Sequence, residues 1–232
     1  MSDDQFSPEA IAEYRARMRP DTVLLMAGGP QRRWPGAEPK QLADLGGETV
    51  IARLLRQLAE NGVVAPVTVC ETPLPGLDGV EHFASTGGYL DALAQTRDLW
   101  RGRILVLAAD TVFSDIALRG ILEAAPPDDS RAAFFGKRYA NAYTDKTWSE
   151  IYGMRFAERG ADRLVAAIDT LRAQRLRRKK LHELHRELSG LRPADRPHLP
   201  PGPLFHDVPD WTDDIDSRRD HENIIKYLKA GI

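Results

Sequence analysis

The sequence predicts an α/β fold in which a parallel β-sheet is covered by helices on both faces. Short apolar runs alternate with amphipathic segments from residue 22 to residue 135, which is the order expected of strands and crossover helices. Residues 104–108 are continuously apolar, as in a strand buried on both faces. A chain of 232 residues is long enough for one large domain with a sizeable core.

The first elements follow from capping residues and from the spacing of apolar positions. Ser7 and Pro8 are typical of the first turn of a helix, because Ser caps the free N–H groups and Pro needs none. Residues 22–26 form the first expected strand. Residues 49–61 read as a helix with one apolar face, and residues 67–70 as a second strand.

The alternation continues to residue 135. Residues 86–99 are predicted to be helical behind a pair of glycines, and residues 103–108 form the third strand. A helix over 116–125 and a strand over 131–135 follow. These elements complete the α/β pattern.

The pattern then changes. Residues 161–191 predict one long helix, or two joined near Arg175, and a Pro-rich connection runs to residue 203. We therefore expect a single domain over residues 1–232, with 161–203 as a helical and Pro-rich insertion. A leucine stripe at three- and four-residue spacing should pack on the domain or on a second subunit as a homodimer; it comprises Leu181, Leu184, Leu188 and Leu191.

Composition excludes several classes of protein. The net charge of −2 argues against a nucleic-acid binder, which is usually strongly basic. Cys70 is the only cysteine, so no disulfide can form within the chain, as suits a reducing cytoplasm. No apolar run approaches the ~20 residues that a membrane span needs, and the polar, acidic N-terminus does not resemble a signal peptide.

The segment TVLLMAGGPQRRW, residues 22–34, predicts a phosphate-binding loop. A strand that ends in Gly28 and Gly29 exposes backbone N–H groups that a phosphate can approach closely. Arg33 and Lys40 then supply positive charge. The alternative is a Gly-Gly turn that only ends a strand. The candidate nucleotide-binding residues here are Met26, Ala27, Gly28, Gly29, Arg33 and Lys40.

Two acidic segments suggest a metal site. Asp110 follows the apolar strand at 103–108, and ligands of open α/β sheets bind at such strand ends. Asp214 and Asp216 would point to the same side of a strand. Carboxylates hold Mg²⁺ together with triphosphate oxygens and water. The alternatives are a turn cap at Asp110 and a solvated acidic loop around residues 211–222.

A fourth segment is a candidate for binding the nucleoside. Ser85, Thr86 and Gly87 lie at the start of the helix expected at 86–99, and small residues there let a base or ribose lie against the backbone. An ordinary Ser/Thr helix cap explains them nearly as well.

Taken together, these segments resemble the signatures of nucleotidyltransferases that transfer an NMP from an NTP to a phosphorylated acceptor. The loop at 26–40 is similar to that of sugar-phosphate nucleotidyltransferases and of molybdenum-cofactor guanylyltransferases, although Pro30 and Gln31 stand where many members have another glycine. The acidic segments resemble the family's two metal-binding elements, with Asp216 aligned to the usual ligand. The three signatures occur in family order and cover about half of the chain.

The resemblance implies a Rossmann-like three-layer mixed sheet and a nucleotidyltransferase reaction that releases pyrophosphate. It implies Mg²⁺ as cofactor, held by Asp110 and Asp216 with Asp214 as companion, and it assigns catalytic roles to Lys40 and Arg33. The substrates would be an NTP and a phosphorylated small molecule. Two other functions stay open: a glycosyltransferase that uses a nucleotide sugar, and a non-catalytic nucleotide-binding relative.

The sequence also indicates roles for other polar residues. Asp213 and Asp220 are expected to be surface or capping residues. The family's acceptor pocket falls on residues 144–156, where a partly buried strand is the alternative; its candidate lining is Lys146, Trp148, Glu150 and Tyr152. The basic run at 172–186 predicts either a solvated helix face or an arm that contributes cations to an anionic acceptor.

Overall fold

A computed structural model of the chain shows a helix-covered α/β fold. It describes residues 7–28, 33, 34, 38–124, 131–138, 143, 146, 148–174, 180–191 and 204–231.

The main sheet has seven strands among the described residues, in the order β3-β2-β1-β4-β7-β6-β8. Their bounds are β1 Thr22–Met26, β2 Val67–Cys70, β3 Glu81–Ala84, β4 Arg103–Ala108, β6 Ala133–Lys137, β7 Glu150–Ala157 and β8 Phe205–Asp207. The strands β3, β2, β1 and β4 run parallel, whereas β7 is antiparallel to both β4 and β6. The sheet is therefore mixed. The family resemblance implies a mixed sheet, whereas the alternation of strands and helices alone predicts a parallel one.

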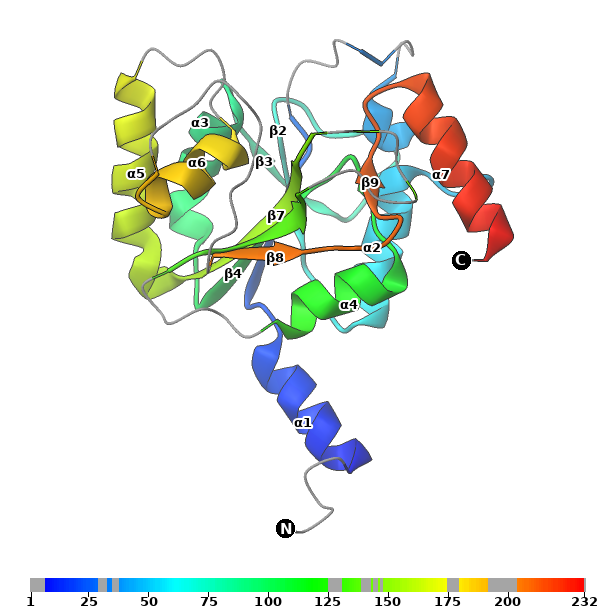
Figure 1. The fold of residues 1–232 in the computed structure, drawn as a ribbon, viewed down its shortest axis with the longest axis horizontal. Helices are drawn as coiled ribbons and strands as arrows, with labels where there is room; N and C mark the ends of the chain where they lie inside the picture. Colours follow the sequence, from blue (N-terminus) through cyan, green and yellow to red (C-terminus); the bar gives the residue numbers. More distant parts are fainter. Residues whose placement is uncertain are drawn as a thin grey trace.

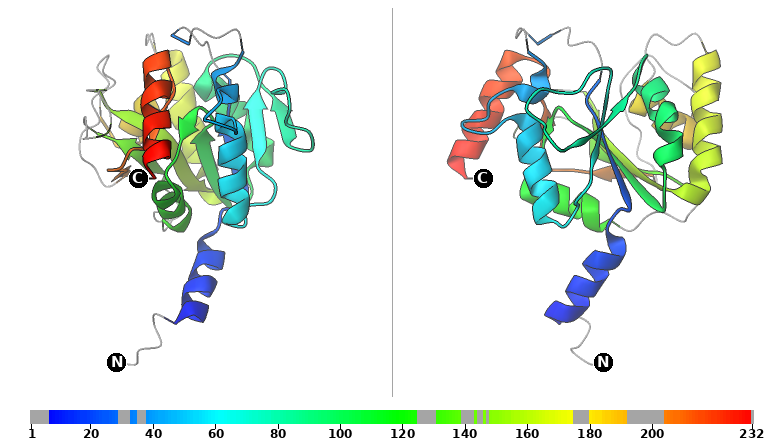
Figure 2. Two further views of the ribbon diagram at one scale, coloured as in Figure 1. Left: turned by 90° about the vertical axis from the view of Figure 1, so that its right-hand side faces the viewer. Right: turned by 180° about the vertical axis from the view of Figure 1, so that it is seen from behind.

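Helices cover both faces of this sheet (Figures 1 and 2). Their bounds are α1 Pro8–Met18, α2 Val50–Glu60, α3 Tyr89–Gln95, α4 Asp115–Glu123, α5 Ala161–Ala173, α6 Leu181–Leu188 and α7 Arg218–Ala230. One apolar core joins the sheet to α3, α5 and α6, and a second joins it to α2 and α4. The helix α1 extends away from the body. None of the described helices has both the length and the apolar character that crossing a membrane requires.

The N-terminal elements confirm the capping and strand predictions closely. Ser7 caps α1 and accepts the N–H of Ala10, and Thr49 caps α2. The strands β1, β2 and β4 have the predicted bounds. The helix expected at 86–99 instead begins at Tyr89 and passes into the 3₁₀ helix η3 Thr96–Leu99. Gly87 has φ +88°, a left-handed conformation that glycine adopts without strain but that an α-helix excludes.

The predicted helix over 161–191 is two helices, α5 and α6; residues 175–179 lie outside the described part of the chain. The leucine stripe packs within the chain, because Leu181 and Leu184 are buried in the core shared with α5 and Leu188 packs against it. Of the two predicted uses, packing on the domain is thus confirmed. The Pro-rich segment at 192–203 lies outside the described residues.

A buried histidine on α6 predicts a dependence of stability on pH. His185 is fully buried between the rings of Phe134 and Phe205. Burial, with smaller effects from the nearby charges of His182, Arg186 and Arg138, lowers its pKa from 6.5 to about 4. The folded protein therefore disfavours the charged imidazole.

We expect the free energy of unfolding to fall by up to about 3 kcal/mol as the pH drops from 6.5 to 4. Between pH 6.5 and 4, His185 binds a proton in the unfolded chain but stays neutral in the folded chain. Above pH 6.5, His185 is neutral in both states. Urea titrations of the parent and of His185→Leu measure the effect. Equal pH slopes for the two proteins would contradict it.

Candidate active site

The candidate site lies at the carboxyl ends of two neighbouring central strands. The strands β1 and β4 pair in parallel, with Met26 opposite Ala108. Gly28 follows the end of β1, and Asp110 follows the end of β4. Gly28, which belongs to the loop at 26–40 (the glycine loop), and Asp110 of the first acidic segment therefore lie at the same edge of the sheet, as the sequence predicted.

A small second sheet brings the C-terminal acids to the same edge. The strand β9 Asp213–Asp214 pairs antiparallel with β5 Thr111–Val112, directly after Asp110. The N–H of Ile215 also donates to the carbonyl of Asp110 at 2.9 Å. As a result, Asp110, Asp214 and Asp216 each place a carboxylate oxygen within 4.8 Å of the others. We call these three residues the carboxylate trio.

Lys40 reaches into the trio from the 3₁₀ helix η2 Lys40–Leu42. Its Nζ lies 2.5 Å from Oδ2 of Asp110 and 2.7 Å from Oδ1 of Asp216. The next residue, Gln41, is buried and donates to the carbonyl of Ala27 at 3.0 Å, which fixes η2 to the end of β1. The exposed Arg33 pairs with the other oxygen of Asp216. Both predicted catalytic cations thus meet the predicted metal ligands.

A buried lysine, Lys146, contacts the trio at Asp214. Lys146 Nζ lies 2.6 Å from Oδ1 of Asp214 and 2.7 Å from its carbonyl oxygen. Burial alone would raise the pKa of Asp214, but the Lys146 ammonium lowers it well below its usual value of 3.8. Asp214 is therefore ionised at neutral pH.

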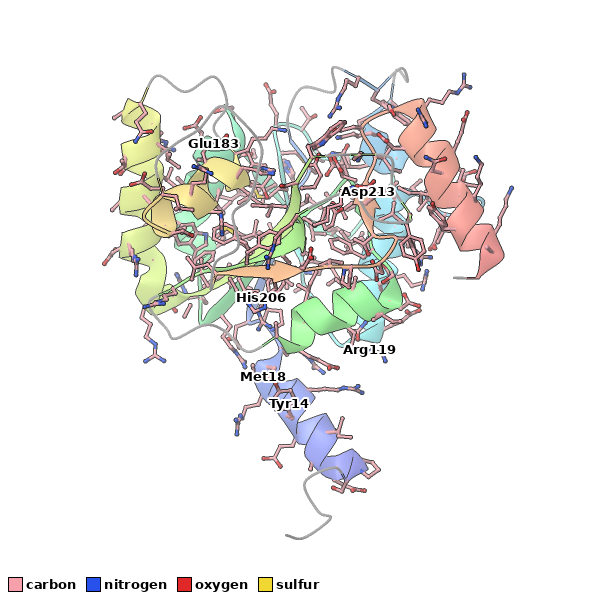
Figure 3. All side chains as sticks on the ribbon, viewed as in Figure 1. Tyr14, Met18, Arg119, Glu183, His206 and Asp213 are labelled. Atoms are coloured by element: carbon pink, nitrogen blue, oxygen red, sulfur yellow. The ribbon has the colours of Figure 1, made fainter. Side chains whose placement is uncertain are left out.

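The two remaining acids of this segment differ in their surroundings. Asp213 was expected at the surface or at a cap, and this is wrong: it is buried, 3.1 Å from Lys146 Nζ and 3.5 Å from Lys137 Nζ. Figure 3 labels it on β9, on the side of the sheet next to α7. Asp220 does cap a helix, because its Oδ2 accepts the N–H of Ser217 at 2.8 Å at the start of α7.

A cavity of about 60 Å³ adjoins the glycine loop. Of the predicted nucleotide-binding residues, it contains Met26, Gly28, Ser85, Thr86 and Gly87. Ala27 is buried beside it, and Gly29 lies outside the described residues. Sequence reasoning missed the other lining residues, which are Glu71, Gly88, Tyr89 and Ala92.

A larger cavity of about 220 Å³ lies along α7. Lys146 and Trp148 line it, as the family's acceptor pocket predicts. On β7, Glu150 is half-buried and Tyr152 is buried; the indole N–H of Trp148 donates to Glu150, and Tyr152 donates to Asp213. Burial and the nearby Asp214 carboxylate raise the pKa of Glu150 to about 8.

Comparison with known families agrees with this geometry. Residues 23–186 match the family described as "MobA-like NTP transferase domain". The chain belongs to this family. The matched region contains the glycine loop, Lys40, Asp110 and Lys146, whereas Asp214 and Asp216 lie beyond it. The sequence resemblance to NTP transferases is thereby confirmed.

Solved structures similar to this member of the family share its fold. A putative glucose-1-phosphate thymidylyltransferase from Bacillus anthracis has a TM-score of 0.60 at 12% identity, over 90% of this chain and 95% of the other. A CTP:phosphocholine cytidylyltransferase from Streptococcus pneumoniae gives 0.58 at 12%, over 89% and 98%. HddC from Yersinia pseudotuberculosis gives 0.57 at 15%, over 89% and 99%. No curated protein matched the chain significantly.

Proposed function

We propose that this NTP transferase family member is a metal-dependent nucleotidyltransferase that joins the NMP of an NTP to a phosphorylated small molecule. The observation that carries the proposal is the position of Lys40 within the carboxylate trio. The smaller cavity is lined by Met26 and Gly28 at the end of β1, which pairs with the strand that leads to Asp110. The larger one is lined by Arg33 and Lys146, which contact Asp216 and Asp214. One site can therefore place a triphosphate beside an acceptor phosphate.

The trio fits a divalent cation such as Mg²⁺. Three carboxylate oxygens within 4.8 Å of one another are hard donors of the kind that Mg²⁺ prefers, and phosphate oxygens and water complete its shell. Asp110 and Asp216 would hold the ion, with Asp214 beside them. When bound, it would neutralise charge on the α-phosphate oxygens.

In the proposed reaction, an oxygen of the acceptor phosphate forms a bond to the α-phosphorus of the NTP. The bond from that phosphorus to the bridging oxygen breaks, and the electron pair leaves with pyrophosphate. Lys40 and Arg33 would stabilise the charge on the triphosphate and on the leaving pyrophosphate. No side chain acts as a nucleophile, so positioning and electrostatics account for the rate.

The described activities of two similar structures are consistent with this chemistry, because the acceptor of each is a phosphorylated compound. One is described as acting on glucose 1-phosphate and the other on phosphocholine. They support the proposed reaction class and leave a choice between a sugar phosphate and a small phosphorylated alcohol.

The proposal is tested by pyrophosphate release with each of the four NTPs against a panel of phosphorylated acceptors. We expect release that requires a divalent metal, an NTP and one acceptor together. A glycosyltransferase would instead consume a nucleotide sugar and release no pyrophosphate. A non-catalytic relative would bind NTP without turnover with any acceptor.

Replacing Lys40 gives a sharper prediction about the loop. Lys40→Ala should lower kcat by about 100-fold, because a cation at a transferring phosphoryl group contributes roughly 3 kcal/mol to the transition state. Steady-state pyrophosphate release measures kcat, and Lys226→Ala, an exposed lysine of α7, is the matched control. A kcat within threefold of the parent would make Lys40 a structural residue only.

A further inference from the structure

The cavity along α7 has one charged end and one aromatic wall. Asp220, Ile224 and Tyr227 line it from one face of α7, at the spacing of successive helical turns. The helix begins directly after the carboxylate trio, and Asp220 lies in its first turn. A ligand in this cavity can therefore have one end at the trio and its other end against α7.

Aromatic rings form much of the wall. Trp211 stacks on Tyr227 with ring centroids 6.5 Å apart, and Tyr143 meets Tyr227 edge-on at 5.7 Å. Tyr227 already donates its hydroxyl to the carbonyl of Tyr143 at 2.6 Å. Trp148 lies closer to the trio, under the guanidinium of Arg33. The wall of the cavity is thus aromatic, with Trp211 and Tyr227 stacked on each other, and the hydroxyl of Tyr227 is already used within the protein.

The charges in the cavity suit a ligand with both a negative and a positive group. Arg33, Lys146 and Arg219 are the cations that line it, and the first two contact the trio. Asp220 lines it too, with Oδ2 engaged by Ser217 and by the N–H of Asp216. Oδ2 also lies 4.0 Å from Lys146 Nζ. For the other oxygen, no hydrogen bond or ion pair is found among the described residues, so this oxygen can face a cation in the cavity.

We propose that the acceptor is a phosphorylated alcohol with a methylated ammonium head group, which rests on the proposed nucleotidyltransferase function. Its phosphate lies near Arg33 and Lys146, and its ammonium group lies between Asp220 and the rings of Trp211 and Tyr227. Ring faces attract a cation through their quadrupole, and most strongly in a partly dry site.

Acceptor specificity tests the head group directly. The probes are phosphocholine, its uncharged carbon isostere 3,3-dimethylbutyl phosphate, and glucose 1-phosphate, each at saturating NTP. We expect kcat/KM to be highest for phosphocholine, with a loss of about tenfold for the isostere. Comparable kcat/KM for phosphocholine and the isostere would overturn the cationic site, and a preference for glucose 1-phosphate would overturn the whole inference. Both outcomes leave the nucleotidyltransferase function standing.

Variants locate the site on α7. Trp211→Leu and Tyr227→Leu should each raise KM for phosphocholine about tenfold without changing KM for NTP, and Tyr227→Phe should raise it less because the ring face remains. Asp220→Asn should reduce the preference for phosphocholine over its isostere. Tyr14→Leu on the distant helix α1 (Figure 3) is the control. Unchanged KM for phosphocholine in both leucine variants would refute the aromatic wall as its site.

Calorimetric binding of phosphocholine, with a non-hydrolysable NTP present, separates this inference from the proposed function. Binding that weakens in Tyr227→Leu supports the inference even if no acceptor is turned over, whereas that lack of turnover rejects the nucleotidyltransferase. Absence of binding to the parent protein overturns the inference whatever the turnover shows.

Discussion

Asp110→Asn is expected to lower kcat by about 100- to 1,000-fold while the fold stays intact. Asp110 occupies the junction between β4 and β5, and its carboxylate contacts Lys40 at 2.5 Å within the trio. The amide keeps the size of the side chain but removes the negative charge that a divalent cation and Lys40 both need. Pyrophosphate release at limiting and at saturating Mg²⁺ measures the loss.

The control for Asp110 is Asp98→Asn, which changes an exposed aspartate of η3. Circular dichroism should be unchanged in both variants. If Asp110→Asn kept full activity at limiting Mg²⁺, the assignment of Asp110 to the metal site would be wrong.

Lys146→Met is expected to destabilise the fold by about 3–5 kcal/mol at neutral pH, because it removes the cation closest to the buried Asp213 and to Asp214. Lys146 is 4% exposed and lies between Asp213 and Asp214 at 3.1 and 2.6 Å. Urea denaturation of the parent and the variant measures the difference. Lys229→Met, at an exposed lysine of α7, should change stability little.

The effect of Lys146→Met should also shrink as the pH falls towards 4. In the parent, the lowered pKa of Asp214 contributes stability that is present above the unfolded pKa and is lost as the pH falls through the folded one. Without the lysine, the partly buried Asp214 would lose its closest cation, so its pKa would rise and protonation would relieve the cost. Equal stability of the two proteins at pH 7 would show that the ion pairs contribute nothing.

Local signals were sufficient for the parts of the fold with short-range causes. The strands at residues 22–26, 67–70 and 103–108 are continuous apolar runs, and Ser7 and Thr49 cap helices through neighbouring N–H groups. The short strands β5, β8 and β9 carry no such pattern. They form because distant segments supply partners, as when β9 pairs with β5 across about a hundred residues.

The candidate site was predictable where the family signatures lie close to the ends of strands. For this reason the sequence indicated that Lys40, Asp110 and Asp216 lie close together. The sequence did not show that Asp213 is buried, because its partners Lys137 and Lys146 come from another part of the chain. The aromatic wall was missed for the same reason. The only local signal was the placement of Ile224 and Tyr227 on the face of α7 that also carries Asp220.

The fate of the α-phosphate tests the central claim most directly. The protein is incubated with Mg²⁺, phosphorylated acceptor and NTP labelled at either the α- or the γ-phosphorus. We predict that the α-label moves into a product that also contains the acceptor, while the γ-label appears only in pyrophosphate. An α-label that stays in NTP, or one found in free nucleotide with orthophosphate as the second product, would contradict nucleotidyl transfer at this site.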